Sequence, residues 1–158
     1  MALRLTSPYF ADGAPIPRQN TCDGDGLSPC LTWFDPPELT SSFVLIMEDP
    51  DARERPMTHW VVFDIPEEAR ELPQNVPGGT IGRTARNALG GHEYVPPCPP
   101  PGDRPHRYRF TLYAIDVPSL DAGEDPVRTT VEDAMNGHTL GAARLVGMYQ
   151  RQPVRSTT

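Results

Sequence analysis

The chain has 158 residues, of which 37% are hydrophobic and 20 are proline, and its formal net charge at pH 7 is −7. This length suits one domain with a substantial core, so we predict a single domain over residues 1–158. The low apolar content disfavours a large helical bundle, and the negative charge disfavours a nucleic-acid partner, which needs clustered positive charge.

The apolar segments are too short to cross a membrane. Residues 1–17, "MALRLTSPYFADGAPIP", contain no apolar stretch of the kind that signal peptides carry. No run elsewhere approaches the roughly eighteen apolar residues of a membrane-spanning helix. We therefore expect no membrane span and a cytoplasmic protein.

Four segments are typical of β-strands because they are rich in β-branched and aromatic residues and are bounded by proline, glycine or aspartate. In chain order they are residues 31–34 ("LTWF", the weakest), 42–48 ("SFVLIME"), 59–65 ("HWVVFDI") and 107–115 ("RYRFTLYAI"). The second and third are continuous apolar runs, which predicts strands that are buried on both faces.

The last of these strands alternates instead. Its predicted inward face carries Tyr108, Phe110, Leu112 and Ala114, and its outward face carries Arg107, Arg109, Thr111 and Tyr113. Strands of this spacing, joined by loops rich in proline and glycine, predict a mainly β fold built as an antiparallel sandwich.

Helix is expected mainly near the C-terminus. Thr130 suits an N-cap with Asp133 three residues later, and Gly137 suits a position just after a helix end. One short helix should therefore run to about residue 135 and a second over residues 139–146, while residues 66–72 could add one more turn. The remainder, above all residues 73–106, is predicted to be a loop, and loops of this length usually carry function.

Residues 96–101 have five prolines in six positions, "PPCPPP". Proline removes backbone donors and holds the chain extended, so this segment is either a stiff surface linker or the preformed wall of a binding site. His106 follows shortly after it, and on a strand the side chains of His106 and Tyr108 share one face. This placement favours the binding-site interpretation.

Four short motifs occur along the chain: "DPDA" at 49–52, "HW" at 59–60, "PCPPPG" at 97–102 and "HRY" at 106–108. In this order they resemble the phosphatidylethanolamine-binding protein family, also called the Raf kinase inhibitor proteins, and most closely its compact bacterial and archaeal branch. The segments "DGLSPCLTW" (25–33) and "GHTLGAARLVGMY" (137–149) are similar to other parts of the family pattern. The resemblance therefore covers about residues 3–151.

This resemblance implies two antiparallel sheets packed as a sandwich, with short helices at the C-terminal side. It also implies a small anion-binding pocket at one end of the central sheet. Carried over position by position, the pocket residues are Asp49, Asp51, His59, Pro100, His106 and Tyr108. The first three should line one side of the pocket and the last three the other.

The chemistry of these side chains predicts a binding protein. Two imidazoles, a phenol and backbone amides near Gly102 offer donors to a phosphate group, while the two aspartates could attract an amine. We therefore expect a phosphate-containing small molecule or lipid headgroup, such as phosphoethanolamine, as the ligand, and no cofactor. The resemblance leaves open an inhibitor of a protein kinase or protease, and a homodimer to which the aromatics of "SPYF" (7–10) contribute.

Metal binding and catalysis are weaker interpretations of the same residues. Aspartate and histidine suit a metal ion, but residue type without ligand spacing is a weak indication. Asp49 beside Pro50 also suits a turn in which the side chain caps its own backbone. A hydrolase would need Cys98 or a His/Asp site, since Ser28 precedes a proline that cannot supply an oxyanion-hole amide. We predict no catalytic residue and no metal.

The three cysteines fit the free thiols of a cytoplasmic protein. Cys22 and Cys30 nevertheless bracket a short loop whose glycines let it double back, so we expect these two to lie close enough to pair. Cys98 would then remain a free thiol.

Overall fold

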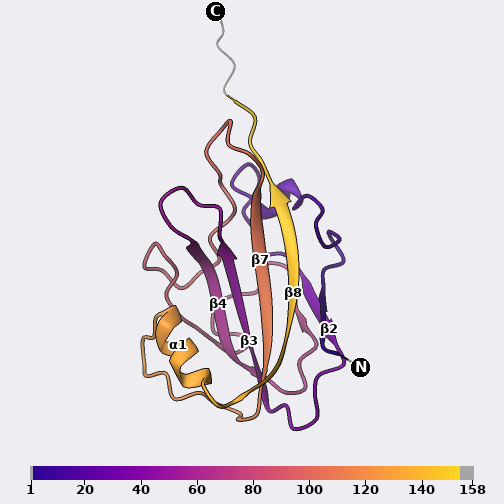
Figure 1. Cartoon of the computed structure of the whole chain (residues 1–158), viewed down its shortest axis with the longest axis vertical. Helices are drawn as coiled ribbons and strands as arrows, with labels where there is room; N and C mark the ends of the chain where they lie inside the picture. The colour runs from indigo at the N-terminus through magenta and orange to yellow at the C-terminus, as the bar shows by residue number, and fades with distance from the viewer. Residues whose placement is uncertain (1, 154–158) are drawn as a thin grey trace, which may run out of the picture.

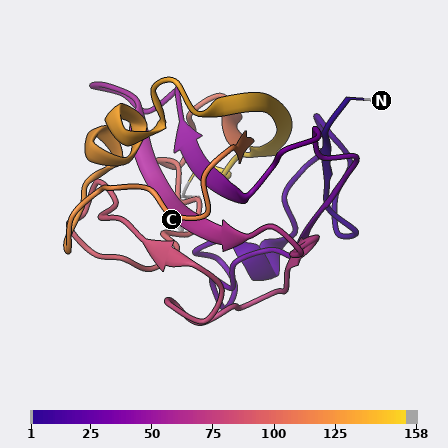
Figure 2. The same cartoon turned by 90° about the horizontal axis from the view of Figure 1, so that it is seen from below.

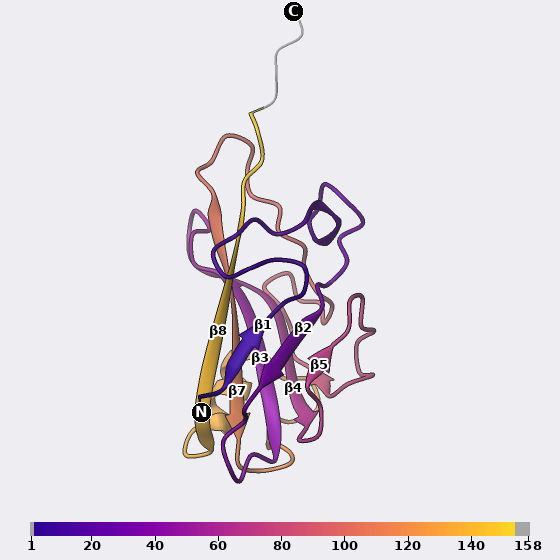
Figure 3. The same cartoon turned by 90° about the vertical axis from the view of Figure 1, so that its right-hand side faces the viewer.

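The computed structural model describes residues 2–153; Met1 and residues 154–158, which the predicted domain also includes, lie outside the described residues. The chain folds into two antiparallel sheets (Figure 1, Figure 3). The larger sheet has the strand order β6-β4-β3-β7-β8, with the bounds Arg83–Thr84, Met57–Pro66, Ser42–Asp49, His106–Ile115 and Thr139–Tyr149. The smaller sheet has the order β1-β2-β5, with the bounds Arg4–Thr6, Leu31–Phe34 and Glu71–Leu72. The helical elements are the 3₁₀-helix η1 (Arg18–Asn20) and the α-helix α1 (Arg128–Met135).

The main core lies between the two sheets. Trp33 of β2 meets Phe43 of β3 with 5.5 Å between the ring centroids. The strand β7 contributes the predicted inward face, Tyr108, Phe110, Leu112 and Ala114, all of which belong to this buried cluster. That prediction is confirmed. Full burial of one such large apolar side chain contributes about 1.5–3 kcal/mol, so this layer supplies much of the driving force for folding.

A second core covers the opposite face of the larger sheet. Val44 and Ile46 of β3 pack there with Val131 and Met135 of α1. Figure 2 shows α1 and the smaller sheet on opposite sides of the larger one. The strand β3 is therefore buried on both faces, as its continuous apolar run predicts. The predicted mainly β sandwich is confirmed, and the four predicted strands correspond to β2, β3, β4 and β7.

The C-terminal segment is a strand where the sequence predicts a helix. The strand β8 pairs with β7 along nearly its whole length, so the helix predicted over residues 139–146 is wrong. Tertiary pairing overrides the helix-favouring leucine and alanine residues of this segment. Gly147 shows how closely the strand packs, because a Cβ atom at this position would lie 2.4 Å from Ile16 Cγ1 and 2.9 Å from Phe10 Cε2.

Three smaller predictions also need correction. The helix α1 begins at Arg128, and its N-cap is Val127, three residues before the predicted cap Thr130. Residues 66–72 comprise the end of β4, a turn and β5 rather than a helical turn. Phe10 is buried in the main core, so of the two aromatics in "SPYF" Tyr9 is the exposed one, and the homodimer stays a prediction. Within residues 2–153, no helix is both long enough and apolar enough to span a bilayer.

A disulfide bond joins Cys22 to Cys98, whose Cα atoms are 5.4 Å apart. The predicted pair of Cys22 and Cys30 is therefore wrong, and so is the predicted free thiol at Cys98; the free cysteine is Cys30, which is buried. The bond spans 76 positions of the sequence and fastens the proline-rich segment to the loop after η1. A hydrogen bond from the Cys22 amide to the Pro97 carbonyl (3.1 Å) reinforces this connection.

One end of the larger sheet, the upper end in Figure 1, gathers the segments that the sequence assigns to a pocket. Here β3 ends and β4 begins, joined by the turn 50–56, and here β7 begins after the proline-rich segment. Because β3 lies between β4 and β7, the ends of these three strands are neighbours. The strand order alone therefore brings Asp49, His59 and His106 together.

Candidate functional site

A cavity of about 340 Å³ opens at this end of the sheet. Its polar lining consists of Asp49, Arg53, His59, His106 and Tyr108. Its apolar lining includes Met57, Leu89, Val95, Pro96, Pro99 and Pro100. The volume is near the lower end of the range of about 300–1,000 Å³ that is usual for small-molecule sites, so the cavity suits a small ligand.

The structure brings five of the six predicted pocket residues to this cavity: Asp49, His59, Pro100, His106 and Tyr108. The alternation of β7 places His106 and Tyr108 on one face of that strand, as the sequence predicts. Tyr108 lies between the two imidazoles, with its ring centroid 5.4 Å from that of His59 and 6.3 Å from that of His106. The aromatic rings thus form one continuous wall.

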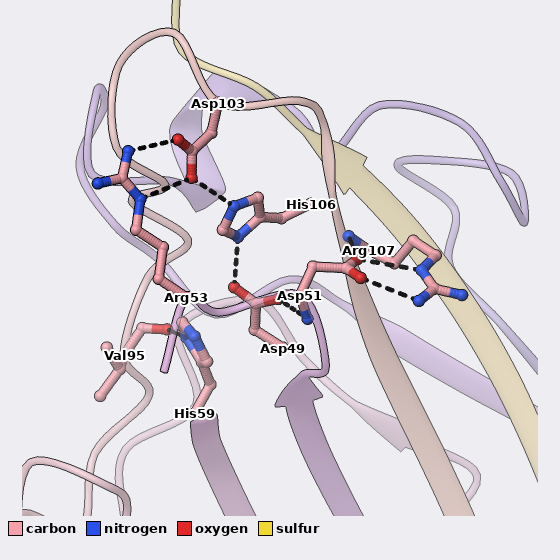
Figure 4. Close-up of polar contacts among 8 residues, drawn as sticks. All are labelled: Asp49, Asp51, Arg53, His59, Val95, Asp103, His106 and Arg107. Carbon is pink, nitrogen blue, oxygen red and sulfur yellow. Dashed lines mark hydrogen bonds and ion pairs between the residues drawn. The ribbon is translucent and has the colours of Figure 1, made fainter. Parts of the chain in front are cut away.

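Asp51, the sixth predicted residue, does not line the cavity. Its carboxylate turns toward Arg107, accepting hydrogen bonds from the backbone amide (2.8 Å) and from the guanidinium Nε (3.0 Å) and Nη2 (2.9 Å) (Figure 4). These contacts with Arg107 outweigh partial burial and lower the pKa of Asp51 to about 2. Asp51 therefore stabilises the turn from outside, and its expected position in the pocket is corrected.

His106 is held between two carboxylates. Its Nδ1–H donates to Asp49 Oδ2 at 2.7 Å and its Nε2–H donates to Asp103 Oδ2 at 3.1 Å (Figure 4). Because both acceptors are carboxylates, both ring nitrogens must carry hydrogen, which is the imidazolium form. Burial opposes this charge, but the two carboxylates outweigh it and raise the pKa of His106 above its ordinary value.

His59 is held in the opposite state. Its Nδ1–H donates to the Val95 carbonyl at 2.7 Å, and no group in residues 2–153 bonds to its Nε2. Burial lowers the pKa of His59, with the Val95 carbonyl and the Asp49 charge as weaker opposing effects. The ring is therefore neutral near pH 7, and its Nε2 is a hydrogen-bond acceptor.

Asp49 combines a local role with a role in the cavity. Its Oδ1 accepts the amide hydrogen of Asp51 at 2.8 Å, which is the turn capping that the sequence predicts beside Pro50. Its Oδ2 is the one that binds His106, and only 5% of the side chain is exposed. Burial and the Asp49 charge raise the pKa of Tyr108, so the phenol stays protonated and can donate a hydrogen bond.

Two charged residues near His106 are absent from the sequence prediction: Arg53 lines the cavity, and Asp103 lines a neighbouring hollow. Asp103 accepts hydrogen bonds from His106 and from Arg53, whose Nη2 lies 2.6 Å from Asp103 Oδ1. Arg53 belongs to the turn after β3, while Asp103 belongs to the turn before β7. The sequence feature that could have indicated Asp103 is its position three residues before His106, in the turn that leads into β7.

The proline-rich segment forms much of the apolar wall, and Val95, directly before it, fixes His59. The Val95 amide donates to the His59 carbonyl at 3.1 Å, while the Val95 carbonyl accepts from the same residue's ring. The backbone amides near Gly102 are not available to a ligand, contrary to expectation. Gly102 N–H donates to the Arg151 carbonyl (3.0 Å) and Asp103 N–H to the Pro100 carbonyl (3.1 Å). These two amides are therefore engaged within the protein.

The structure also bears on catalysis and metal binding, the two weaker interpretations of the sequence. Cys98 cannot act as a nucleophile in this structure because its sulfur is bonded to Cys22. Ser28 is buried and does not line the cavity. Among the described residues, no three or more histidine, cysteine, aspartate or glutamate side chains converge so as to hold a metal ion.

Comparisons of the sequence and of the fold identify known proteins that are similar to this chain. The family model for phosphatidylethanolamine-binding protein matches residues 6–150. The chain is 43% identical over 152 residues to a UPF0098 protein of Aquifex aeolicus, covering 94% of this chain and 89% of the relative. Its fold is similar to that of CT736, a phosphatidylethanolamine-binding protein homologue from Chlamydia trachomatis (37% identity, TM-score 0.87, 96% of this chain and 99% of the other). YbcL from E. coli is similar too (27% identity, TM-score 0.88, 96% and 100%).

Proposed function

The chain belongs to the phosphatidylethanolamine-binding protein family, and we propose that its cavity binds a small phosphate-containing zwitterion of the phosphoethanolamine type. The ligand is either the free compound or the same headgroup on a lipid. The protein acts by binding, without changing the ligand's covalent bonds. The observation that carries this proposal is the contrast between the partners of the two histidines that line one cavity: His106 lies between two carboxylates, and His59 bonds to a backbone carbonyl.

The cavity presents positive and negative groups at separate places. Arg53 and the His106 imidazolium supply positive charge at the mouth, and the Tyr108 phenol adds an uncharged donor. Asp49 and the neutral His59 Nε2 supply acceptors at the base. A zwitterion with an anionic and a cationic end complements both places, whereas a simple anion or a simple amine meets like charge at one of them.

The apolar wall limits the size and the orientation of the ligand. Met57, Val95 and Pro100 flank the polar base and give the short carbon chain of such a ligand an apolar surface. The wall is anchored by the disulfide bond and by prolines, so little ordering is needed on binding. A cavity of this small volume suits a headgroup rather than an acyl chain.

The test is a titration with phosphoethanolamine, followed by NMR on the ring signals of the four histidines. His59 and His106 should shift and saturate, while His92 and His138 should stay in place. His59→Ala should abolish saturable binding, and His138→Ala, at an exposed histidine paired with Asp116, is the matched control. Shifts of all four signals together, or of none, would contradict the proposal.

Three further probes define the ligand. Ethanolamine and inorganic phosphate should each bind at least about tenfold more weakly than phosphoethanolamine, since each lacks one charge-assisted contact. Vesicles of phosphatidylcholine with and without phosphatidylethanolamine distinguish the lipid headgroup from the free compound. Cosedimentation that depends on phosphatidylethanolamine, and is lost in His59→Ala, would favour the lipid.

A further inference from the structure

The two cations at the mouth of the cavity share one carboxylate. Asp103 Oδ1 accepts from Arg53 Nη2 at 2.6 Å, and Asp103 Oδ2 accepts from Arg53 Nε at 3.4 Å and from His106 Nε2 at 3.1 Å (Figure 4). Both oxygens of Asp103 are therefore engaged. The Arg53 and His106 nitrogens that point at this carboxylate are therefore occupied by a group of the protein itself.

We propose that Asp103 is an internal occupant of the anion subsite, and that a ligand's phosphate group displaces it to bind Arg53 and His106. This inference rests on the proposed function and deepens it. The subsite formed by Arg53 and His106 is distinct from the acceptors Asp49 and His59 at the base. Asp103 keeps the subsite filled until a ligand that also reaches the base arrives.

The two carboxylates on His106 differ in how firmly they are held, and this decides which one moves. Asp49 is 5% exposed and is fixed by the Asp51 amide as well as by His106. Asp103 is 19% exposed, and its partner Arg53 is 67% exposed. Exposed ion pairs contribute little to stability, whereas breaking a buried pair is costly. Asp103 is therefore the carboxylate that yields.

The backbone allows this exchange without rearrangement of the wall. Asp103 N–H donates to the Pro100 carbonyl (3.1 Å), and Gly102 between them has a φ of 88°, which suits the third position of a type II turn. Gln150 Nε2 holds the Asp103 carbonyl at 3.2 Å. With its backbone fixed in this way, the Asp103 side chain can leave the subsite by rotating about its own bonds.

Phosphate suits the vacated position because a guanidinium fork binds phosphate and carboxylate in the same bidentate manner. A tethered carboxylate nevertheless competes at high effective concentration, so the subsite is weak toward simple anions. A zwitterion gains additional contacts with Asp49 and His59 that offset this competition. Asp103 would thus set the selectivity of the cavity for zwitterions over inorganic phosphate.

The test measures binding of inorganic phosphate and of phosphoethanolamine to the full chain and to Asp103→Ala by calorimetry. The measurement is made at pH 6, below the ordinary histidine pKa of about 6.5, so that His106 stays charged in both proteins. Asp103→Ala should bind inorganic phosphate about tenfold more tightly, with a smaller gain for phosphoethanolamine. Asp103→Asn, which keeps the shape but loses the charge, should show an intermediate gain.

Asp125→Ala is a matched control, because Asp125 also bridges an arginine and a histidine, Arg86 (2.9 Å) and His92 (3.1 Å), but away from the cavity. It should leave both affinities unchanged. In the Asp103→Ala background, Arg53→Gln should remove the gain toward phosphate. A gain that survives Arg53→Gln would contradict the subsite.

The outcomes separate this inference from the proposed function. Wild-type protein that binds phosphoethanolamine, with Asp103→Ala no tighter toward phosphate, overturns the inference alone. Wild-type protein that binds neither probe, with Asp103→Ala binding both, supports the inference and contradicts the function of the native chain. Failure of both proteins to bind either probe, with native NMR spectra, overturns both proposals.

Discussion

His59 and His106 lie on the two strands that flank β3, yet the structure holds them in opposite charge states. Their exposed fractions are nearly equal, 3% and 4%, and both rings contact Tyr108. Burial alone would therefore make both neutral. The difference comes from their partners, a backbone carbonyl at His59 and two carboxylates at His106.

The comparison teaches that the partner determines what a buried histidine offers to a ligand. A carbonyl fixes the hydrogen on Nδ1 of His59 and leaves Nε2 as an acceptor. Carboxylates on both nitrogens of His106 keep it charged. Two residues of one type thus give one cavity an acceptor and a cation, which is the asymmetry that a zwitterion requires.

The two histidines also depend on different parts of the fold. The partner of His59, Val95, directly precedes the proline-rich segment, which the Cys22–Cys98 disulfide fastens to the loop after η1. The partners of His106 are the side chains of Asp49, the last residue of β3, and of Asp103, in the turn before β7. Changes to the disulfide and to the carboxylates should therefore affect the two rings separately.

Removing the disulfide should have the largest effect. In the double variant Cys22→Ser/Cys98→Ser, the free energy of unfolding should fall by about 4 kcal/mol, because the unfolded chain regains the freedom of a loop of some 76 residues. The NMR signal of the His59 ring should move more than that of His106. Urea unfolding and histidine NMR measure the two effects.

Thiol counting supplies the control for this variant. Unfolded without reductant, the wild-type chain should have one alkylatable cysteine, Cys30, and after reduction it should have three. Three reactive thiols without reductant would mean that the bond does not form in the source of the protein. Since disulfides persist in oxidising compartments, the count from native cells also tests the expected cytoplasmic location.

The next largest effects should come from replacing each histidine, and the two replacements should differ in their cost to stability. His106→Ala leaves the Asp49 carboxylate buried without its cation and should lower the free energy of unfolding by roughly 3–5 kcal/mol. His59→Ala removes one hydrogen bond to a carbonyl that faces the cavity and should cost about 1–2 kcal/mol. Equal losses in urea unfolding would show that His106 does not hold Asp49.

Much of the sandwich and of the site follows from patterns within single strands. The alternation of residues 107–115 predicts which side chains of β7 face the core, and it places His106 beside Tyr108. The continuous run of β3 predicts burial on both faces. These patterns are legible because they depend on the geometry of one strand and on no distant partner.

The parts that the sequence does not predict depend on contacts between distant segments. Cys22 pairs with Cys98 across 76 positions rather than with the nearby Cys30. The segment 139–149 has helix-favouring residues but becomes β8 because β7 offers it a complete set of partners. Asp51 and Asp49 stand in one motif, and only the position of Arg107 shows that Asp51 turns outward.

Titration should separate the charge states directly. Followed by NMR, His106 should titrate above about 6.5 and His59 below it, since their pKa values are raised and lowered respectively. Affinity for phosphoethanolamine should accordingly weaken as the pH rises through the raised pKa of His106. Titration of both rings at the ordinary value would remove the basis of the comparison.

The same shifts predict opposite effects on stability. His106 contributes stability that is fully present below about pH 6.5 and is lost as the pH rises through its raised pKa. His59 contributes stability that is present above about pH 6.5 and is lost as the pH falls through its lowered pKa. Urea unfolding across this range should show that His106→Gln removes the loss of stability on raising the pH. His59→Gln should remove the loss of stability on lowering the pH.

Asp51→Asn should have the smallest effect and tests the boundary of the site. The affinity for phosphoethanolamine should change by less than about twofold, because Asp51 pairs with the exposed Arg107 outside the cavity. Asp49→Asn, at the other aspartate of the motif, should weaken binding by about tenfold or more, because it loses a charged contact with the ligand. Equal losses of affinity in the two variants would show that Asp51 also contributes to the binding site.

The effect of Asp51→Asn on stability should also depend on pH in a definite direction. The pKa of Asp51 is lowered to about 2 by Arg107, so its contribution is present above about pH 4 and is lost as the pH falls through 2. Wild type should therefore be more stable than Asp51→Asn at pH 5, and the difference should shrink at pH 3. A difference that grows in acid would show that Asp51 is not ionised in the folded protein, and the outward ion pair with Arg107 would then be wrong.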